Sequence, residues 1–67
     1  MDSKTLFESM NHYVRLIERG GRERKSKIIL FESEYDSGDG EACIWLDDDL
    51  DPGILRQSEI LSLEILD

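Results

Sequence analysis

The chain has 67 residues, with 16 acidic and 8 basic side chains, a net charge of −8 and a pI near 4.4. Domains usually run to about 100–150 residues, so we expect one domain, residues 1–67. One cysteine cannot form an internal disulfide, and one cysteine with one histidine cannot supply the four ligands of a structural zinc site. The domain therefore depends on burying apolar surface, within itself or against a partner.

No leader or membrane segment is predicted. Residues 1–4 lack the basic start of a signal peptide, and the longest clean apolar run, residues 28–31, is far too short to span a bilayer. These features predict a cytoplasmic protein that does not have a membrane as its partner. Its small size, not these features, is the ground for placing it in a bacterial cell or in an infected host cell.

The first predicted element is a helix over residues 3–19. Its apolar stripe recurs every three or four residues, at Leu6, Met10, Val14 and Ile17. Ser3 or Thr5 would cap its start. Gly20 and Gly21 would end it, because glycine accepts the left-handed conformation found at helix C-termini.

Three strands are predicted after the helix. Residues 27–35 and 41–47 are rich in β-favouring or apolar side chains, and the turn-rich residues 36–40 between them suit an antiparallel hairpin. Asp51 and Pro52 would begin a short helical turn, since proline is preset for the first helical position. Residues 59–66 then alternate apolar and polar side chains, as a strand does.

This α-β-β-β order predicts an α+β fold in which one N-terminal helix packs on a three-stranded antiparallel sheet. One sheet face would carry Ile29, Phe31, Ile44, Leu46, Leu61, Leu63 and Ile65. The other would carry Ile28, Leu30, Cys43, Trp45, Ile60 and Leu66. One helix covers one face, and the sequence leaves open which. The second face is expected to be partly exposed, covered by the sheet's own curl, or docked on a partner.

The charges are divided between the two halves of the chain. Residues 1–30 contain seven basic and four acidic side chains, net +3, whereas residues 31–67 contain one basic and twelve acidic side chains, net −11. The carboxylates predicted to face a partner lie at the ends and loops of the hairpin: Glu32, Glu34, Asp36, Asp39, Glu41, Asp47, Asp48, Asp49 and Asp51. Clustered carboxylates repel one another, and a basic partner surface would offset that repulsion.

This hypothesis requires the carboxylates to lie together and not to be paired with the chain's own arginines. The alternative is a solvated acidic surface that keeps a small domain soluble. A rigid domain presenting carboxylates could instead occupy a groove that binds the phosphates of duplex DNA.

In composition and expected architecture, the chain resembles the small acidic phage proteins that block restriction, repair or CRISPR enzymes, although no motif assigns it to one such family. The resemblance implies a non-enzymatic DNA-mimic inhibitor of the anti-CRISPR or anti-restriction type. Its partner would be a basic, nucleic-acid-binding host protein, with no direct contact to nucleic acid.

Trp45 supports a second hypothesis. It is the only tryptophan, and tryptophan is prominent among residues that dominate binding energy at interfaces. With Leu30 and Ile28 it would form an apolar sheet face through which a small homodimer, or an antitoxin- or immunity-type protein, docks. The basic residues 19–27 are read as a solvated loop, although a head-to-tail contact with the acidic hairpin of a second copy stays open.

No catalytic, metal or cofactor site is predicted. Cys43 and His12 are the only nucleophile–base pair, and they fall in the middle of different predicted elements. Residues 47–51 begin like a calcium loop, but Pro52 and Ser58 stand where such a loop needs glycine and glutamate. We therefore expect a protein that is not an enzyme and carries no cofactor.

Overall fold

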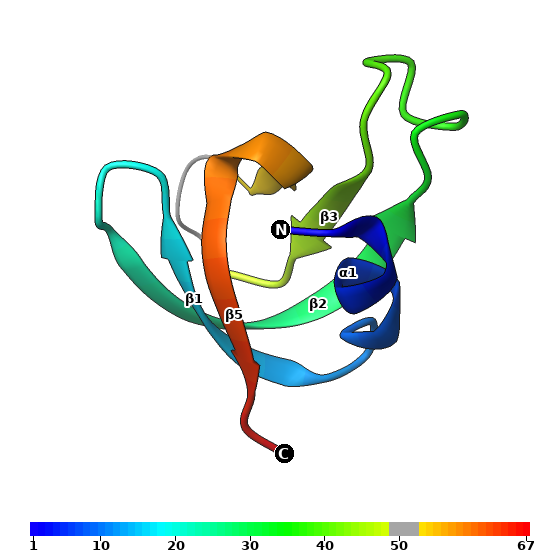
Figure 1. The fold of residues 1–67 in the computed structure, drawn as a ribbon. Helices are drawn as coiled ribbons and strands as arrows, with labels where there is room; N and C mark the ends of the chain where they lie inside the picture. Colours follow the sequence, from blue (N-terminus) through cyan, green and yellow to red (C-terminus); the bar gives the residue numbers. More distant parts are fainter. Residues whose placement is uncertain (49–52) are drawn as a thin grey trace.

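A computed structural model describes residues 1–48 and 53–67 of the chain. Its elements, in order, are α1 (Ser3–Glu8), β1 (Tyr13–Glu18), β2 (Glu23–Glu32), β3 (Cys43–Leu46), β4 (Ile54–Arg56), the 3₁₀ turn η1 (Gln57–Glu59) and β5 (Ile60–Ile65). The strands form one antiparallel sheet in the order β4-β3-β2-β1-β5 (Figure 1). Strands β1 to β4 therefore follow one another, and β5 returns to pair with β1.

The predicted fold, a helix packed on a three-stranded sheet, is wrong. Within the described residues the chain forms five strands and a helix of only six residues. Strands do occur near the predicted ranges 27–35, 41–47 and 59–66, with different bounds, and β2 pairs with β3 as an antiparallel hairpin. The strands β1 and β4 were missed, and the predicted helical turn at Asp51 and Pro52 lies outside the described residues.

The helix predicted over residues 3–19 ends after Glu8, and its second half is strand β1. The Ser9 hydroxyl donates to the Leu6 carbonyl at 2.6 Å, which satisfies one acceptor at the helix end. Asn11 then has φ 70°, a left-handed conformation that asparagine tolerates better than most residues and that turns the chain. From Tyr13 onward, burial alternates residue by residue, which is the period of a strand.

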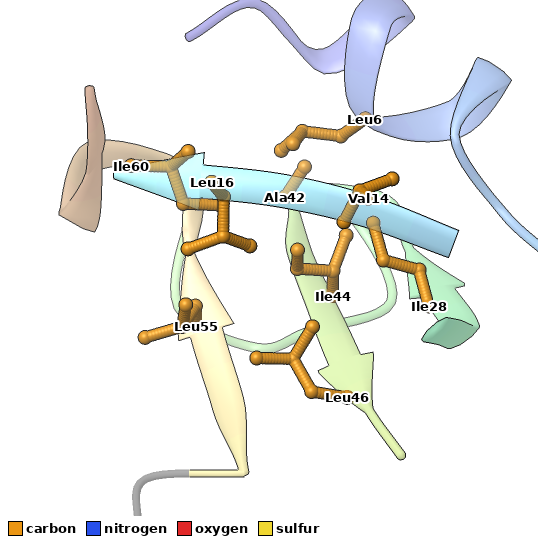
Figure 2. Close-up of a cluster of buried hydrophobic side chains, with 9 residues drawn as sticks. All are labelled: Leu6, Val14, Leu16, Ile28, Ala42, Ile44, Leu46, Leu55 and Ile60. Atoms are coloured by element: carbon orange, nitrogen blue, oxygen red, sulfur yellow. The ribbon is translucent and has the colours of Figure 1, made fainter. Parts of the chain in front are cut away.

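The sheet curls around a single core (Figure 2), made by α1, all five strands and Ala42: Leu6, Val14, Leu16, Ile28, Ala42, Ile44, Leu46, Leu55 and Ile60. The predicted division of apolar residues between two faces is therefore also wrong. The register of β2 against β3 shifts between Ile28 and Leu30, so Ile28 joins Ile44 in the core while Leu30 points outward.

The short helix α1 is fixed to this core by Leu6, its one buried residue. The Asp2 carboxylate accepts a hydrogen bond from the Thr5 backbone N–H at 2.7 Å and so caps the helix. This bond lowers the pKa of Asp2. On the solvent side, Phe7 packs against Phe31 of β2, which places α1 beside the end of β2 where the next loop begins.

Candidate protein-binding surface

The loop between β2 and β3 carries the first group of predicted partner-binding carboxylates. In Figure 1 this segment, in green, extends away from the sheet. Glu34, Asp36 and Asp39 are all exposed. The loop is held by its own hydrogen bonds: the Ser33 hydroxyl donates to Asp36 at 3.2 Å, and the Ser37 hydroxyl donates to the backbone carbonyl of Glu41 at 2.6 Å. The three carboxylates therefore sit on an ordered projection from the molecule.

Three other predicted carboxylates have contacts within the chain. Glu41 accepts hydrogen bonds from the Ser58 backbone N–H at 2.7 Å and from its hydroxyl at 3.2 Å, which joins the loop to η1. Glu32 accepts the indole N–H of Trp45 at 2.8 Å. Asp48 lies 2.7 Å from the guanidinium of the buried Arg24.

The predicted acidic surface is thus divided. Glu34, Asp36 and Asp39 lie together on the β2–β3 loop, and Asp47 is exposed at the opposite end of β3. Asp49 and Asp51 lie outside the described residues. Asp48 is paired with Arg24, whereas the hypothesis requires carboxylates that are not paired with the chain's own arginines. Within residues 1–48 and 53–67, Glu34, Asp36, Asp39 and Asp47 have no ion pair within 4.0 Å.

The only basic residue in the second half of the chain, Arg56, is next to this loop. It is paired with Glu59 at 3.1 Å, and this contact is the main reason that its pKa is raised. Asp39 and Glu41 raise it further, by smaller amounts. Glu59 in turn has a lowered pKa, chiefly because its carboxylate accepts the backbone N–H of Arg56 at 3.0 Å.

An exposed apolar row crosses the outer face of β2, β3 and β4. Leu30 lies directly opposite Trp45, which lies directly opposite Ile54. These three residues are 41%, 37% and 43% exposed. We call Leu30, Trp45 and Ile54 the apolar row. Ile28, which the sequence placed beside Trp45, is fully buried. Ile54 was not recognised, because the three-residue strand β4 is too short to show a periodic pattern.

The side chain of Trp45, in the middle of the apolar row, is held in place by Glu32. Its indole N–H is bound by Glu32, and Glu32 also accepts a weak hydrogen bond from the Cys43 thiol at 3.6 Å. Burial, followed by these contacts with Glu32, raises the pKa of Cys43, so the thiol stays in its weakly nucleophilic protonated form.

His12 is engaged at the other end of the chain. Its Nδ1 lies 2.8 Å from the Asp67 carboxylate, which also accepts the Tyr13 backbone N–H at 3.0 Å. The Tyr13 bond first, and the His12 contact second, lower the pKa of Asp67. His12 and Cys43 therefore have different partners and do not form a nucleophile–base pair.

Basic side chains gather at the other end of β2. Lys25 and Lys27 are exposed and lie opposite Arg15 and Tyr13 of β1. Arg15 is paired with Glu23 at 3.2 Å. The long strand β2 thus begins among positive side chains and ends at the acidic loop, so the charge asymmetry of the sequence becomes an asymmetry in space.

The chain matches none of the known protein families, curated proteins or solved structures with which it was compared. In the described part of the chain, neither α1 nor η1 has the length and apolar character needed to cross a membrane. Over the same residues, no group of three or more His, Cys, Asp or Glu side chains is placed to hold a metal ion.

Proposed function

We propose that this chain is a non-enzymatic, DNA-mimic-like inhibitor that occludes a basic, nucleic-acid-binding surface of a partner protein. One observation carries the proposal: residues 31–55 contain nine carboxylates and no lysine, arginine or histidine. Four of these carboxylates, Glu34, Asp36, Asp39 and Asp47, are exposed. The proposed site of action is the cytoplasm of a bacterial or infected host cell.

The arrangement supports this mode of binding in two ways. The acidic loop is anchored by strands at both ends and by internal hydrogen bonds, so little ordering entropy is lost when it meets a partner. Beside it, the apolar row provides a contact that does not depend on salt, with Trp45 at its centre. Charge would speed and orient the encounter, and the apolar row would prolong the complex.

Neutralising three exposed carboxylates, Asp36→Asn, Asp39→Asn and Asp47→Asn together, is expected to weaken partner binding by about tenfold or more near 0.1 M salt, where screening extends over ~10 Å. The measurement is capture of nucleic-acid-binding proteins from a bacterial lysate, with duplex DNA added as competitor. Proteins that the wild type retains should be released both by the DNA and by salt of about 0.5 M. The variant should fail to retain them.

The matched control removes the same charge elsewhere: Glu8→Gln, Glu23→Gln and Glu64→Gln. It should retain the same proteins as the wild type, because these carboxylates lie outside residues 31–55. Equal loss in both triple variants would indicate a general effect of net charge and contradict the proposal. Retention that neither DNA nor salt disturbs would contradict it as well.

A second candidate, a homodimer formed through the apolar row, is favoured by the register of the sheet. Glu32 and Arg56 both lie opposite Cys43, on the two strands that flank β3. If two copies met face to face about a two-fold axis along β3, Glu32 of one copy would therefore lie opposite Arg56 of the other. The same axis would place Leu30 opposite Ile54, so this face is complementary to itself.

For this candidate, Trp45→Ala is expected to shift the chain from dimer to monomer, because the dimer dissociation constant should rise by at least about tenfold. Sedimentation at increasing protein concentration measures the shift. Leu61→Ala is the control, because Leu61 is 59% exposed on β5, the opposite edge strand from β4. A wild-type chain that stays monomeric at the highest concentration would exclude the homodimer and leave the inhibitor proposal as it stands.

A further inference from the structure

An aromatic groove of about 340 Å³ lies between α1 and the start of the β2–β3 loop. Phe7, Phe31 and Tyr35 line it, together with two charged residues, Lys4 and Glu34, and two serines. The groove is separate from the apolar row, with which it shares no residue. Its volume is near the lower end of the range of small-ligand sites, which is about 300–1,000 Å³.

The aromatic rings of the groove are unusually exposed. Phe7 is 56% exposed and Tyr35 is 88% exposed. Phe7 and Phe31 meet edge to face, with centroids 5.5 Å apart and an interplanar angle of 76°. Phe31 also packs against the core, and the buried Leu6 beside Phe7 fixes α1, so the two rings are held by the fold. The groove is therefore preformed, with aromatic surface accessible to a ligand.

The two chain segments that carry the groove are acidic on balance, which favours a cationic ligand. Residues 1–8, which include α1, contain one basic and two acidic side chains. The other wall is formed by Phe31, Ser33, Glu34 and Tyr35, within residues 31–42, which contain five acidic side chains and no basic one. Lys4 is the one lining side chain that would repel a cation, and Glu34 is the one that would attract it.

We propose that this groove binds a cationic side chain, an arginine or a lysine, presented by the basic partner. The proposal rests on the proposed function, because the basic partner supplies the cation. The aromatic rings would contact the apolar stem and the charged head, since a cation over an aromatic face is attracted by the negative charge of the ring face. Glu34 would supply the counter-charge at the edge of the groove.

The test uses the isolated chain and three small probes of matched shape: the methylamides of acetyl-arginine, acetyl-citrulline and acetyl-glutamate. Backbone amide chemical shifts of residues 3–8 and 31–35 report binding at each probe concentration. The arginine probe should shift these amides at millimolar concentration, several-fold more tightly than its neutral citrulline counterpart. The glutamate probe should not shift them.

Two single variants give effects of opposite sign. Glu34→Gln should weaken the arginine probe by about two- to fivefold, and Lys4→Gln should strengthen it by a similar factor, as expected for exposed charge contacts. Tyr35→Ala should also weaken it, and this ring is too exposed for its loss to unfold the chain. Glu64→Gln, on β5, is the control and should leave the affinity unchanged.

Three results would overturn the proposal. The citrulline probe could bind as tightly as the arginine probe; the glutamate probe could bind, with an affinity that Lys4→Gln lowers; or no probe could shift the amides at tens of millimolar. The capture variant described above leaves every lining residue of the groove intact. If the probes fail while capture still depends on Asp36, Asp39 and Asp47, only the groove proposal falls. If the arginine probe binds but capture fails, the proposed function falls.

Discussion

Replacing Arg24 by methionine is expected to remove most of the protein's stability, with a loss of about 3–5 kcal/mol in the free energy of unfolding. A domain of this size has a total stability on the order of 5 kcal/mol. The expected loss is large because the charged group is inside the molecule: the Arg24 side chain is completely buried on the inner side of β2.

Arg24 connects two parts of the chain that are distant in sequence. Its guanidinium lies 2.7 Å from Asp48, after β3, and 3.6 Å from Glu18, at the end of β1. The side chains of Glu18 and Asp48 are only 12% and 17% exposed. Methionine preserves much of the volume but removes the positive charge, so both carboxylates would lose a counter-ion in a poorly solvated site.

Urea unfolding followed by the fluorescence of Trp45, the only tryptophan, measures this loss. Lys25→Met is the matched control, because Lys25 is the next residue on β2 and points to solvent; it should change stability by no more than about 0.5 kcal/mol.

A double variant tests the coupling directly. Adding Asp48→Asn to Arg24→Met should restore about 1 kcal/mol or more, because the second change removes the negative charge of one of the two carboxylates that lost the Arg24 contact. If the two changes were instead additive, the ion pair would not be the source of the stability.

The Arg24 ion pair also shows why part of the candidate site could not be found in the sequence. Asp48 lies in a run of aspartates, and composition alone treats every member of that run as surface charge. The structure pairs Asp48 with an arginine that composition places in a solvated basic loop. Whether a carboxylate faces a partner or pairs within its own chain depends on which side of a strand its counter-ion occupies. The predicted strand, residues 27–35, began after Arg24, whereas β2 begins at Glu23 and turns Arg24 inward.

The helix prediction failed for a related reason. An apolar residue at every third or fourth position predicts a helix, but Val14 and Leu16 also satisfy the alternation of a strand. Pairing decides between the two: β1 is hydrogen-bonded to β2 on one side and to β5 on the other. The partner strand β5 is more than forty residues away along the chain, so no local pattern could contain that information.

Other parts of the site follow from local chemistry and were predictable. The glycines and aspartates of residues 36–40 indicated a turn, and Gly38 and Gly40 do adopt positive φ there, which places the surrounding carboxylates on an exposed loop. Alternation along residues 43–46 gave Trp45 the side of β3 opposite to Ile44 and Leu46, and it is exposed while they are buried. The bulge that buries Ile28 depends on pairing and was not predictable.

Leu6→Ala is expected to lower the free energy of unfolding by about 2–5 kcal/mol, the cost of a buried leucine cavity in a packed core. Leu6 is fully buried and is the one side chain through which α1 enters the core (Figure 2). A helix of six residues has almost no stability of its own, so its position depends on this contact and on the Asp2 cap. Loss of the contact should therefore detach α1 as well as destabilise the sheet.

The two effects can be separated by experiment. Urea unfolding gives the global loss, and hydrogen exchange of the α1 amides under native conditions gives the local one. Phe7→Ala is the neighbouring control: Phe7 is 56% exposed, so its truncation should cost about 1 kcal/mol, mainly the ring contact with Phe31. If Leu6→Ala cost no more than Phe7→Ala, α1 would not be anchored in the core, and the groove between α1 and the acidic loop would not be preformed.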